Sequence, residues 1–236
     1  MSRRPSNNDA ATRVRRRLFG HAPGSLLAGT RWGRFHADYA DVAHYFDRWA
    51  DNRAPDLFFS RGYDHDAHGH YCAPGVLSHQ VSARLPPKAN VLDVGCGTGL
   101  AGAELVRSGH RVTGIDISPR MAQRALAKGY TSVRIFDVTA VELPWGRAFD
   151  ACICVGLLGE WIRPETLLPK LLGVLRDDAV IGLTLERQNA ALEYVFALLQ
   201  DAGFTVYRQE VGVGFRHFMC STIRYHYIVA GRRTNA

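Results

Sequence analysis

Residues 91–99 read VLDVGCGTG, and this stretch decides the fold class of the 236-residue chain. An apolar run contains one acid near its end, and glycines then occupy positions 95, 97 and 99. A helical pattern follows directly over residues 100–108. This order predicts a strand, a tight turn that lacks Cβ atoms, and a helix N-terminus against which a cofactor can lie. The sequence therefore predicts an α/β protein with a Rossmann-like sheet.

The next apolar segment indicates what kind of cofactor is bound. Residues 112–116 end in Asp116, a carboxylate 21 residues after Gly95. That separation suits hydrogen bonds to a pair of ribose hydroxyls, which points to a nucleoside cofactor. Gly97, Gly99 and Gly102 also satisfy the dinucleotide fingerprint. A dinucleotide-dependent oxidoreductase is therefore an alternative at this point.

The acid and the glycines begin one step before that fingerprint, as Asp93-x-Gly95-x-Gly97-x-Gly99. This pattern resembles motif I of the class I S-adenosylmethionine-dependent methyltransferases. The resemblance implies that Asp93 and the turn, including Cys96, hold the amino acid end of S-adenosylmethionine, with S-adenosylhomocysteine as the product. It also implies a seven-stranded, mostly parallel sheet with an antiparallel C-terminal hairpin and a helical N-terminal lid.

The same resemblance assigns cofactor contacts to the ends of later strands. Residues 133–138 resemble the third strand, with Asp137 at the acidic position that accepts a hydrogen bond from the adenine amino group. Residues 149–156 resemble the fourth strand, whose end lies near the reacting methyl group. The cofactor contacts implied after the glycine turn are Asp116, Ile117, Met121, Asp137, Val138, Val155 and Gly156.

A second informative stretch precedes the glycine turn. Trp49, then Tyr63-Asp64-x-Asp66, then Tyr71-x-Ala73-Pro74 resemble the lead-in of the Williams-Beuren-region methyltransferase-like family. The resemblance covers about residues 45–230 and implies a lid over the cofactor, with Tyr63 contacting its methionine end. The spacing between Trp49 and Tyr63 is longer than the family pattern, so the substrate is not carried over.

Histidines 65, 68 and 70 in this stretch have no counterpart in the family pattern. With Asp64 and Asp66 they are of the types that bind zinc, iron or nickel. The spacing is short and irregular and Gly69 favours a loop, so we assign no metal. A general base near the methyl group is a second interpretation, and solvated loop histidines are the third. The catalytic candidates are His68, His70 and His217.

The remainder of the chain fits the expected sheet. The pattern predicts helices over residues 164–176 and 188–202 and strands over residues 180–185, 205–211 and 222–230. The last two strands are joined by a loop alone, over residues 212–221, so we expect an antiparallel hairpin where a dinucleotide enzyme needs a helix. Substrate contacts are predicted at the pocket rim, which comprises Leu157, Leu158, Glu160, Trp161 and residues 216–219, chiefly Leu157, Trp161 and His217.

Charge and composition limit the classes of partner that the protein can have. Residues 1–34 contain eight arginines and one acid, and so carry the whole net charge of +7. The remaining residues carry no net charge, so the domain gives no strong signal for nucleic acid. No apolar stretch suits a transmembrane span or an export signal. The five cysteines match neither a metal-site nor a disulfide pattern, so we expect free thiols. We therefore expect a cytoplasmic protein; its oligomeric state is left open.

We divide the chain into a basic extension (1–34), a helical lid or substrate-cap segment (35–86) and a cofactor-binding catalytic domain (87–236). The predicted function is methyl transfer from S-adenosylmethionine to an oxygen, nitrogen, sulfur or carbon atom of a small molecule. One alternative is a protein that binds the cofactor without methylating. Another is methylation of a protein or RNA partner recruited by the basic extension.

Overall fold

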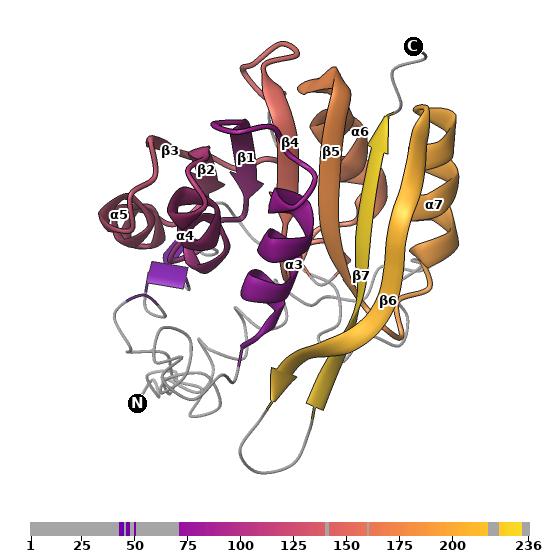
Figure 1. Cartoon of the computed structure of the whole chain (residues 1–236). Helices are drawn as coiled ribbons and strands as arrows, with labels where there is room; N and C mark the ends of the chain where they lie inside the picture. The colour runs from indigo at the N-terminus through magenta and orange to yellow at the C-terminus, as the bar shows by residue number, and fades with distance from the viewer. Residues whose placement is uncertain are drawn as a thin grey trace, which may run out of the picture.

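A computed structural model describes residues 43, 44, 46, 47, 50, 71–139, 142–159, 161–216 and 222–232. Seven strands form a single sheet in the order β3-β2-β1-β4-β5-β7-β6 (Figure 1). Strands β1 to β5 pair in parallel, and β7 is antiparallel to both of its neighbours. This arrangement confirms the predicted mostly parallel sheet with an antiparallel C-terminal hairpin.

Strands and helices alternate among the described elements, except that β4 follows β3 directly and β7 follows β6 directly. The strands are β1 (Asn90–Val94), β2 (Arg111–Asp116), β3 (Ser132–Ile135), β4 (Phe149–Cys154), β5 (Leu175–Glu186), β6 (Phe204–Arg216) and β7 (Thr222–Arg232). The helices are α3 (Ala73–Ser82), α4 (Leu100–Arg107), α5 (Pro119–Ala127), α6 (Pro164–Gly173) and α7 (Leu192–Asp201).

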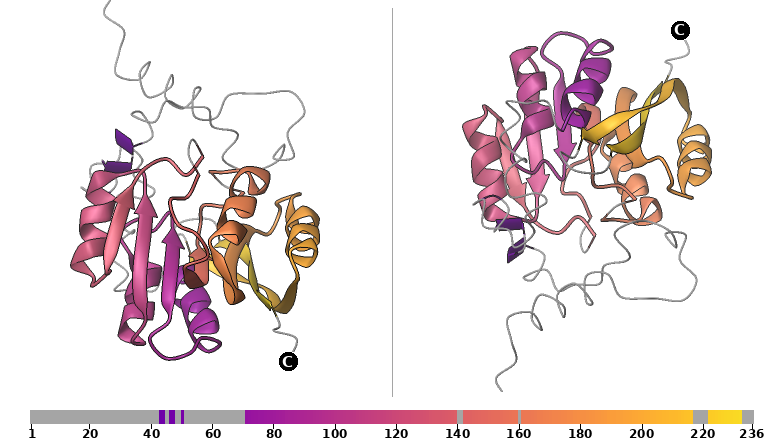
Figure 2. Two further views of the ribbon diagram at one scale, coloured as in Figure 1. Left: turned by 90° about the horizontal axis from the view of Figure 1, so that it is seen from above. Right: turned by 90° about the horizontal axis from the view of Figure 1, so that it is seen from below.

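Helices cover both faces of the sheet (Figure 2). Leu168 of α6 belongs to the buried cluster on one face, together with Leu92 of β1. Leu105 of α4 belongs to the cluster on the other face, together with Val91 of the same strand. Successive residues of β1 therefore enter different cores, as expected for a parallel strand that is covered on both sides.

Three predicted boundaries are wrong at or next to β5, which itself begins at Leu175 instead of residue 180. Helix α6 ends at Gly173 instead of residue 176, because Leu175 already pairs with Phe149 of β4. Helix α7 begins at Leu192 instead of residue 188. The preceding turn is held by Asn189, whose side-chain oxygen accepts a hydrogen bond from the Ala191 amide at 2.9 Å. Tertiary pairing at one end and a side-chain turn at the other override the helical pattern.

The predicted loop over residues 212–221 is also too long. Strand β6 continues to Arg216, which pairs with Thr222 of β7. Its glycines weaken the strand signal in the sequence, but pairing with β7 continues along it despite two register shifts. Since Tyr225, near the start of β7, pairs with Glu186 at the end of β5, the end of the hairpin at which β6 ends and β7 begins lies at the carboxyl edge of the parallel strands.

Helix α3 falls inside the segment 35–86 that is predicted to be a cap. Its Leu77 and Val81 are fully buried in the core of one sheet face, so α3 belongs to the helical layer. The extent of the cap before α3 stays a prediction. None of the described helices is long and apolar enough to cross a membrane.

Candidate cofactor site

The glycine turn connects β1 to α4 and is fixed against the end of β2. The amides of Gly95 and Cys96 both donate hydrogen bonds to the carbonyl of Ile115, each at 2.9 Å. Gly99 caps α4 with φ +86°, a backbone conformation that side chains other than glycine rarely adopt. The strand, turn and helix predicted from residues 91–108 are therefore present.

This turn lies where the order of the strands reverses. Strand β1 pairs with β2 on one side and with β4 on the other, and ligands of open α/β sheets bind in the crevice at such a point. A pocket opens here, with about 260 Å³ of empty space that is partly open to solvent. Its lining residues are Tyr71, Pro74, Asp93, Gly95, Cys96, Thr98, Leu100, Ala101 and Val155.

Asp93 is the one acidic residue of this lining, and its side chain is almost wholly buried. Its Oδ2 accepts a hydrogen bond from the Tyr130 hydroxyl at 2.5 Å. Burial raises the pKa of Asp93 to about 7, although the Tyr130 hydrogen bond lowers it, and the charge of Asp116 adds to the increase. Within the described segments no basic side chain forms an ion pair with Asp93. A ligand that brings a positive charge, such as an ammonium group, fits this pocket.

Asp116 stands at the end of β2, beside the same turn. Its Oδ2 accepts from the Gly97 amide at 2.8 Å, and its Oδ1 accepts from the Ser118 amide at 2.9 Å. Burial raises its pKa to about 6, against the lowering effect of these backbone hydrogen bonds. Each carboxylate oxygen has a second lone pair, so Asp116 can still accept hydrogen bonds from ribose hydroxyls.

Five other predicted cofactor residues are described but do not line this pocket. Asp137 accepts from the amide and the hydroxyl of Thr139, at 2.7 and 2.6 Å, and so closes a local turn after β3. After β4, the Gly156 amide donates to the Thr184 hydroxyl at 2.8 Å. Val138 and Met121 are buried and Ile117 is half-buried. The contacts of all five with a cofactor stay predictions.

The predicted substrate rim is only partly described. The Leu157 side chain lies over the glycine turn, where a Cβ on Gly95 would come within 2.6 Å of it. Trp161 packs edge to face on Phe46, with ring centroids 4.9 Å apart. Leu158 is fully buried in the core, and its place on the rim stays a prediction. Tyr63, Glu160, His65, His68, His70 and His217 lie outside the described residues.

Among the residues of the site that were not identified from the sequence, three make notable side-chain contacts. Tyr71 lines the pocket, and its hydroxyl lies 2.4 Å from where a Cβ on Gly156 would be. Asp47 accepts hydrogen bonds from the Ser118 hydroxyl at 2.5 Å and the Arg120 amide at 3.1 Å, at the start of α5. Tyr130 binds Asp93. Tyr71 belonged to the lead-in pattern, but no local signal indicated the long-range contacts of the other two.

Comparison with known proteins identifies the family of this chain. Residues 91–178 match a family model described as a methyltransferase domain. Methyltransferase-like protein 27 from Homo sapiens is 34% identical over 168 residues, which make up 68% of this chain but only 64% of that protein. The ubiquinone biosynthesis O-methyltransferase of Xanthomonas oryzae pv. oryzae (strain PXO99A) is 31% identical over 182 residues, or 71% of this chain and 72% of that protein.

A solved structure gives the same fold. The magnesium protoporphyrin IX methyltransferase (ChlM) from Synechocystis PCC 6803 with bound SAM matches with a TM-score of 0.60 and 22% identity, over 84% of this chain and 98% of that one. The sheet order, the glycine turn with its two acids and these relatives confirm the resemblance seen in motif I. The chain belongs to the class I S-adenosylmethionine-dependent methyltransferases, and S-adenosylmethionine is its cofactor.

Proposed function

We propose that this protein transfers a methyl group from S-adenosylmethionine to a small-molecule acceptor. The observation that carries the proposal is the lining of the pocket, which has no lysine or arginine among its described residues. Towards the end of β4 it is formed by Tyr71 and Val155, with Leu157 over the turn. An apolar and aromatic wall with few charges suits a small, largely apolar acceptor.

Two further observations support a small acceptor. The names of two relatives refer to small molecules, ubiquinone and magnesium protoporphyrin IX. Beyond residue 34 the chain carries 21 basic and 21 acidic residues. Enzymes that bind RNA or DNA need a basic surface to neutralise phosphates, and residues 35–236 show no net excess of basic residues that would indicate one.

When bound, S-adenosylmethionine supplies a methyl group on a positively charged sulfur, which is already a good leaving group. The contribution of the protein is then to bind, to orient and to exclude water. Asp93 is suited to the ammonium of the cofactor and Asp116 to its ribose, while Tyr71 and Leu157 shield the pocket. Holding two reactants in line contributes on the order of 7 to 11 kcal/mol. We further propose His68, His70 and His217 as candidates for a general base.

The first test is a calorimetric titration of the whole chain with S-adenosylmethionine, S-adenosylhomocysteine and NAD in parallel. We expect the first two to bind and NAD not to bind. Release of S-adenosylhomocysteine is then measured with a panel of phenols, amines, thiols and carboxylic acids, with Asp93→Asn as the inactive control. Turnover with a panel member supports the proposal, and binding of NAD alone contradicts it.

The arginines of residues 1–34 favour a second candidate, methylation of a protein or RNA partner that they recruit. Deleting residues 1–34 distinguishes the two functions. If a small molecule is the acceptor, the deletion leaves turnover and cofactor affinity unchanged. If a macromolecule is the acceptor, the deletion abolishes turnover and spares cofactor affinity. Cofactor binding without turnover on either class of acceptor favours the non-methylating alternative.

A further inference from the structure

Tyr130 lies between α5 and β3, and its ring is buried in a slot formed by glycines. A Cβ on Gly102 would lie 2.1 Å from the Tyr130 hydroxyl oxygen, and one on Gly99 would lie 2.9 Å from its Cε2. A Cβ on Gly114 of β2 would lie 3.1 Å from its Cδ1. Three glycines from the turn, α4 and β2 thus leave space for one aromatic ring. A side chain at Gly102 in particular is incompatible with the ring in this position.

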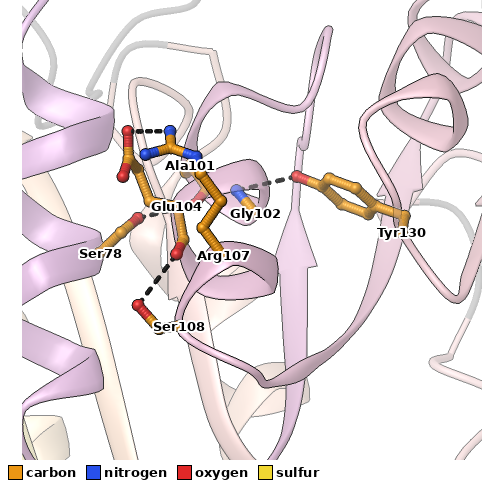
Figure 3. A network of polar contacts seen from close by, with 7 residues as sticks. All are labelled: Ser78, Ala101, Gly102, Glu104, Arg107, Ser108 and Tyr130. Atoms are coloured by element: carbon orange, nitrogen blue, oxygen red, sulfur yellow. Dashed lines mark hydrogen bonds and ion pairs between the residues drawn. The ribbon is translucent and has the colours of Figure 1, made fainter.

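The hydroxyl of Tyr130 has two defined partners. It accepts a hydrogen bond from the Gly102 amide at 3.0 Å, drawn in Figure 3. It donates to Asp93 Oδ2 at 2.5 Å. The amide of Gly102 is a donor only, so the single hydroxyl proton is directed to the carboxylate. One hydroxyl therefore connects the first turn of α4 to the acid of the pocket.

A second contact from the same segment holds the other side of the turn. The ammonium of Lys128 donates to the carbonyl of Thr98 at 2.6 Å. Residues 128–130 thus bind the glycine turn and the start of α4 at Thr98 and Gly102, while Asp116 binds the amide of Gly97 from β2. These contacts fix the segment that carries Tyr130 against the turn and α4. The hydroxyl proton of Tyr130 is therefore held toward Asp93.

We propose that Tyr130 is a positioning residue for cofactor binding, whose hydroxyl keeps the carboxylate of Asp93 ionised and oriented toward the ammonium of S-adenosylmethionine. Only an ionised Asp93 attracts that ammonium. In the pocket without ligand, burial opposes ionisation, and the phenol is the side-chain donor that favours it. Tyr130 acts through Asp93 and need not touch the cofactor.

The groups that face Asp93 from the surrounding elements respond differently to pH. Burial raises the pKa values of the Tyr130 phenol and of the Cys96 and Cys152 thiols well above their usual values, so all three stay protonated near neutral pH. Asp116, with a pKa of about 6, is mostly ionised at pH 7 and above. Around pH 7 the ionisation that changes most is therefore that of Asp93 itself.

The test is the affinity of Tyr130→Phe for S-adenosylhomocysteine, measured by calorimetry from pH 6.5 to 9. Loss of the donor raises the pKa of Asp93, so a smaller fraction is ionised at pH 7 and the apparent affinity falls by that fraction. We expect a loss of roughly tenfold at pH 7 that shrinks to less than about twofold at pH 9. Tyr207→Phe, which removes a phenol on exposed β6, is the matched control and should keep the wild-type affinity.

A double-mutant cycle separates positioning from general damage to the fold. In an Asp93→Asn background the residue has no charge to preserve, so Tyr130→Phe should cause little further loss. Equal losses in both backgrounds, or a loss that does not change between pH 7 and pH 9, would overturn the proposal. Methyl transfer is not required in any arm, so a wrong acceptor class does not affect the outcome.

A measurement on the wild-type chain covers the case in which Tyr130→Phe does not fold. If Asp93 must ionise to receive the ammonium, binding at pH 7 releases about half a proton. The binding enthalpy then varies with the ionisation enthalpy of the buffer. A binding enthalpy that is the same in all buffers at pH 7, or no binding at all, would contradict the role of Asp93 and with it that of Tyr130.

Discussion

Replacement of Gly102 by alanine tests the packing of the cofactor site. Where a helix has room for a Cβ, the change from glycine to alanine stabilises by about 0.5 to 1 kcal/mol. Half-buried Gly75 of α3 has this room, because a Cβ there meets nothing within 4 Å. At Gly102 the same Cβ would lie 2.1 Å from the Tyr130 hydroxyl. Overpacking costs about 1 to 3 kcal/mol, and the displaced hydroxyl loses hydrogen bonds that contribute about 1 kcal/mol or more. We expect Gly102→Ala to destabilise the protein by about 2 to 4 kcal/mol.

Urea denaturation of both variants gives the two free energies of unfolding. Gly75→Ala should raise the midpoint and Gly102→Ala should lower it. In a Tyr130→Ala background the ring is gone, so Gly102→Ala should cost little there. If both glycine variants shift the midpoint in the same direction, or if the cost of Gly102→Ala persists without the ring, the close packing of Tyr130 on Gly102 is wrong.

Asp116→Ala should weaken S-adenosylmethionine binding by about 1.5 to 3 kcal/mol for each ribose hydrogen bond lost, as measured by calorimetry, whereas Asp177→Ala at an exposed position of β5 should not. Asp93→Asn should stabilise the ligand-free protein at pH 8 by up to about 4 kcal/mol. The folded-state pKa of Asp93 is about 7 and exceeds the ordinary value of 3.8. The wild-type protein therefore loses stability as the pH rises from 3.8 to 7, and the asparagine variant does not. Thermal unfolding at pH 5 and pH 8 checks this, and an equal pH dependence in both proteins would contradict it. Asp47→Ala removes an acceptor at the start of α5, so hydrogen exchange at the Arg120 amide should accelerate, and unchanged exchange would show that the contact does not protect it.

The local pattern of residues 91–116 was sufficient to predict the core of the fold. A buried strand, glycines and a helix leave few arrangements, and the lack of a helical pattern between the last two strands predicted the hairpin. The prediction was wrong where contacts with residues distant in the sequence determine the secondary structure. Leu175 and Arg176 have a helical pattern but join β5, because Leu175 pairs with β4 and Arg176 forms an ion pair with Asp150.

The site, like the fold, was predicted only in part. Asp93, Gly95, Cys96 and Val155 do line one pocket. Gly102 matched a dinucleotide fingerprint, but the structure gives a different reason for glycine there, which is the approach of the Tyr130 hydroxyl. That partner is 28 residues away, and no periodicity connects a tyrosine after one helix with a glycine inside another.

The raised pKa values of the two buried acids have a consequence for engineering this protein. Without cofactor, the burial of Asp93 and Asp116 as carboxylates destabilises the folded chain. Replacement by asparagine would remove this destabilisation. A directed-evolution screen that rewards heat resistance in the absence of cofactor therefore selects against the acids that receive it. The same screen run with saturating S-adenosylhomocysteine would reward their retention, because ligand binding then contributes to the measured stability.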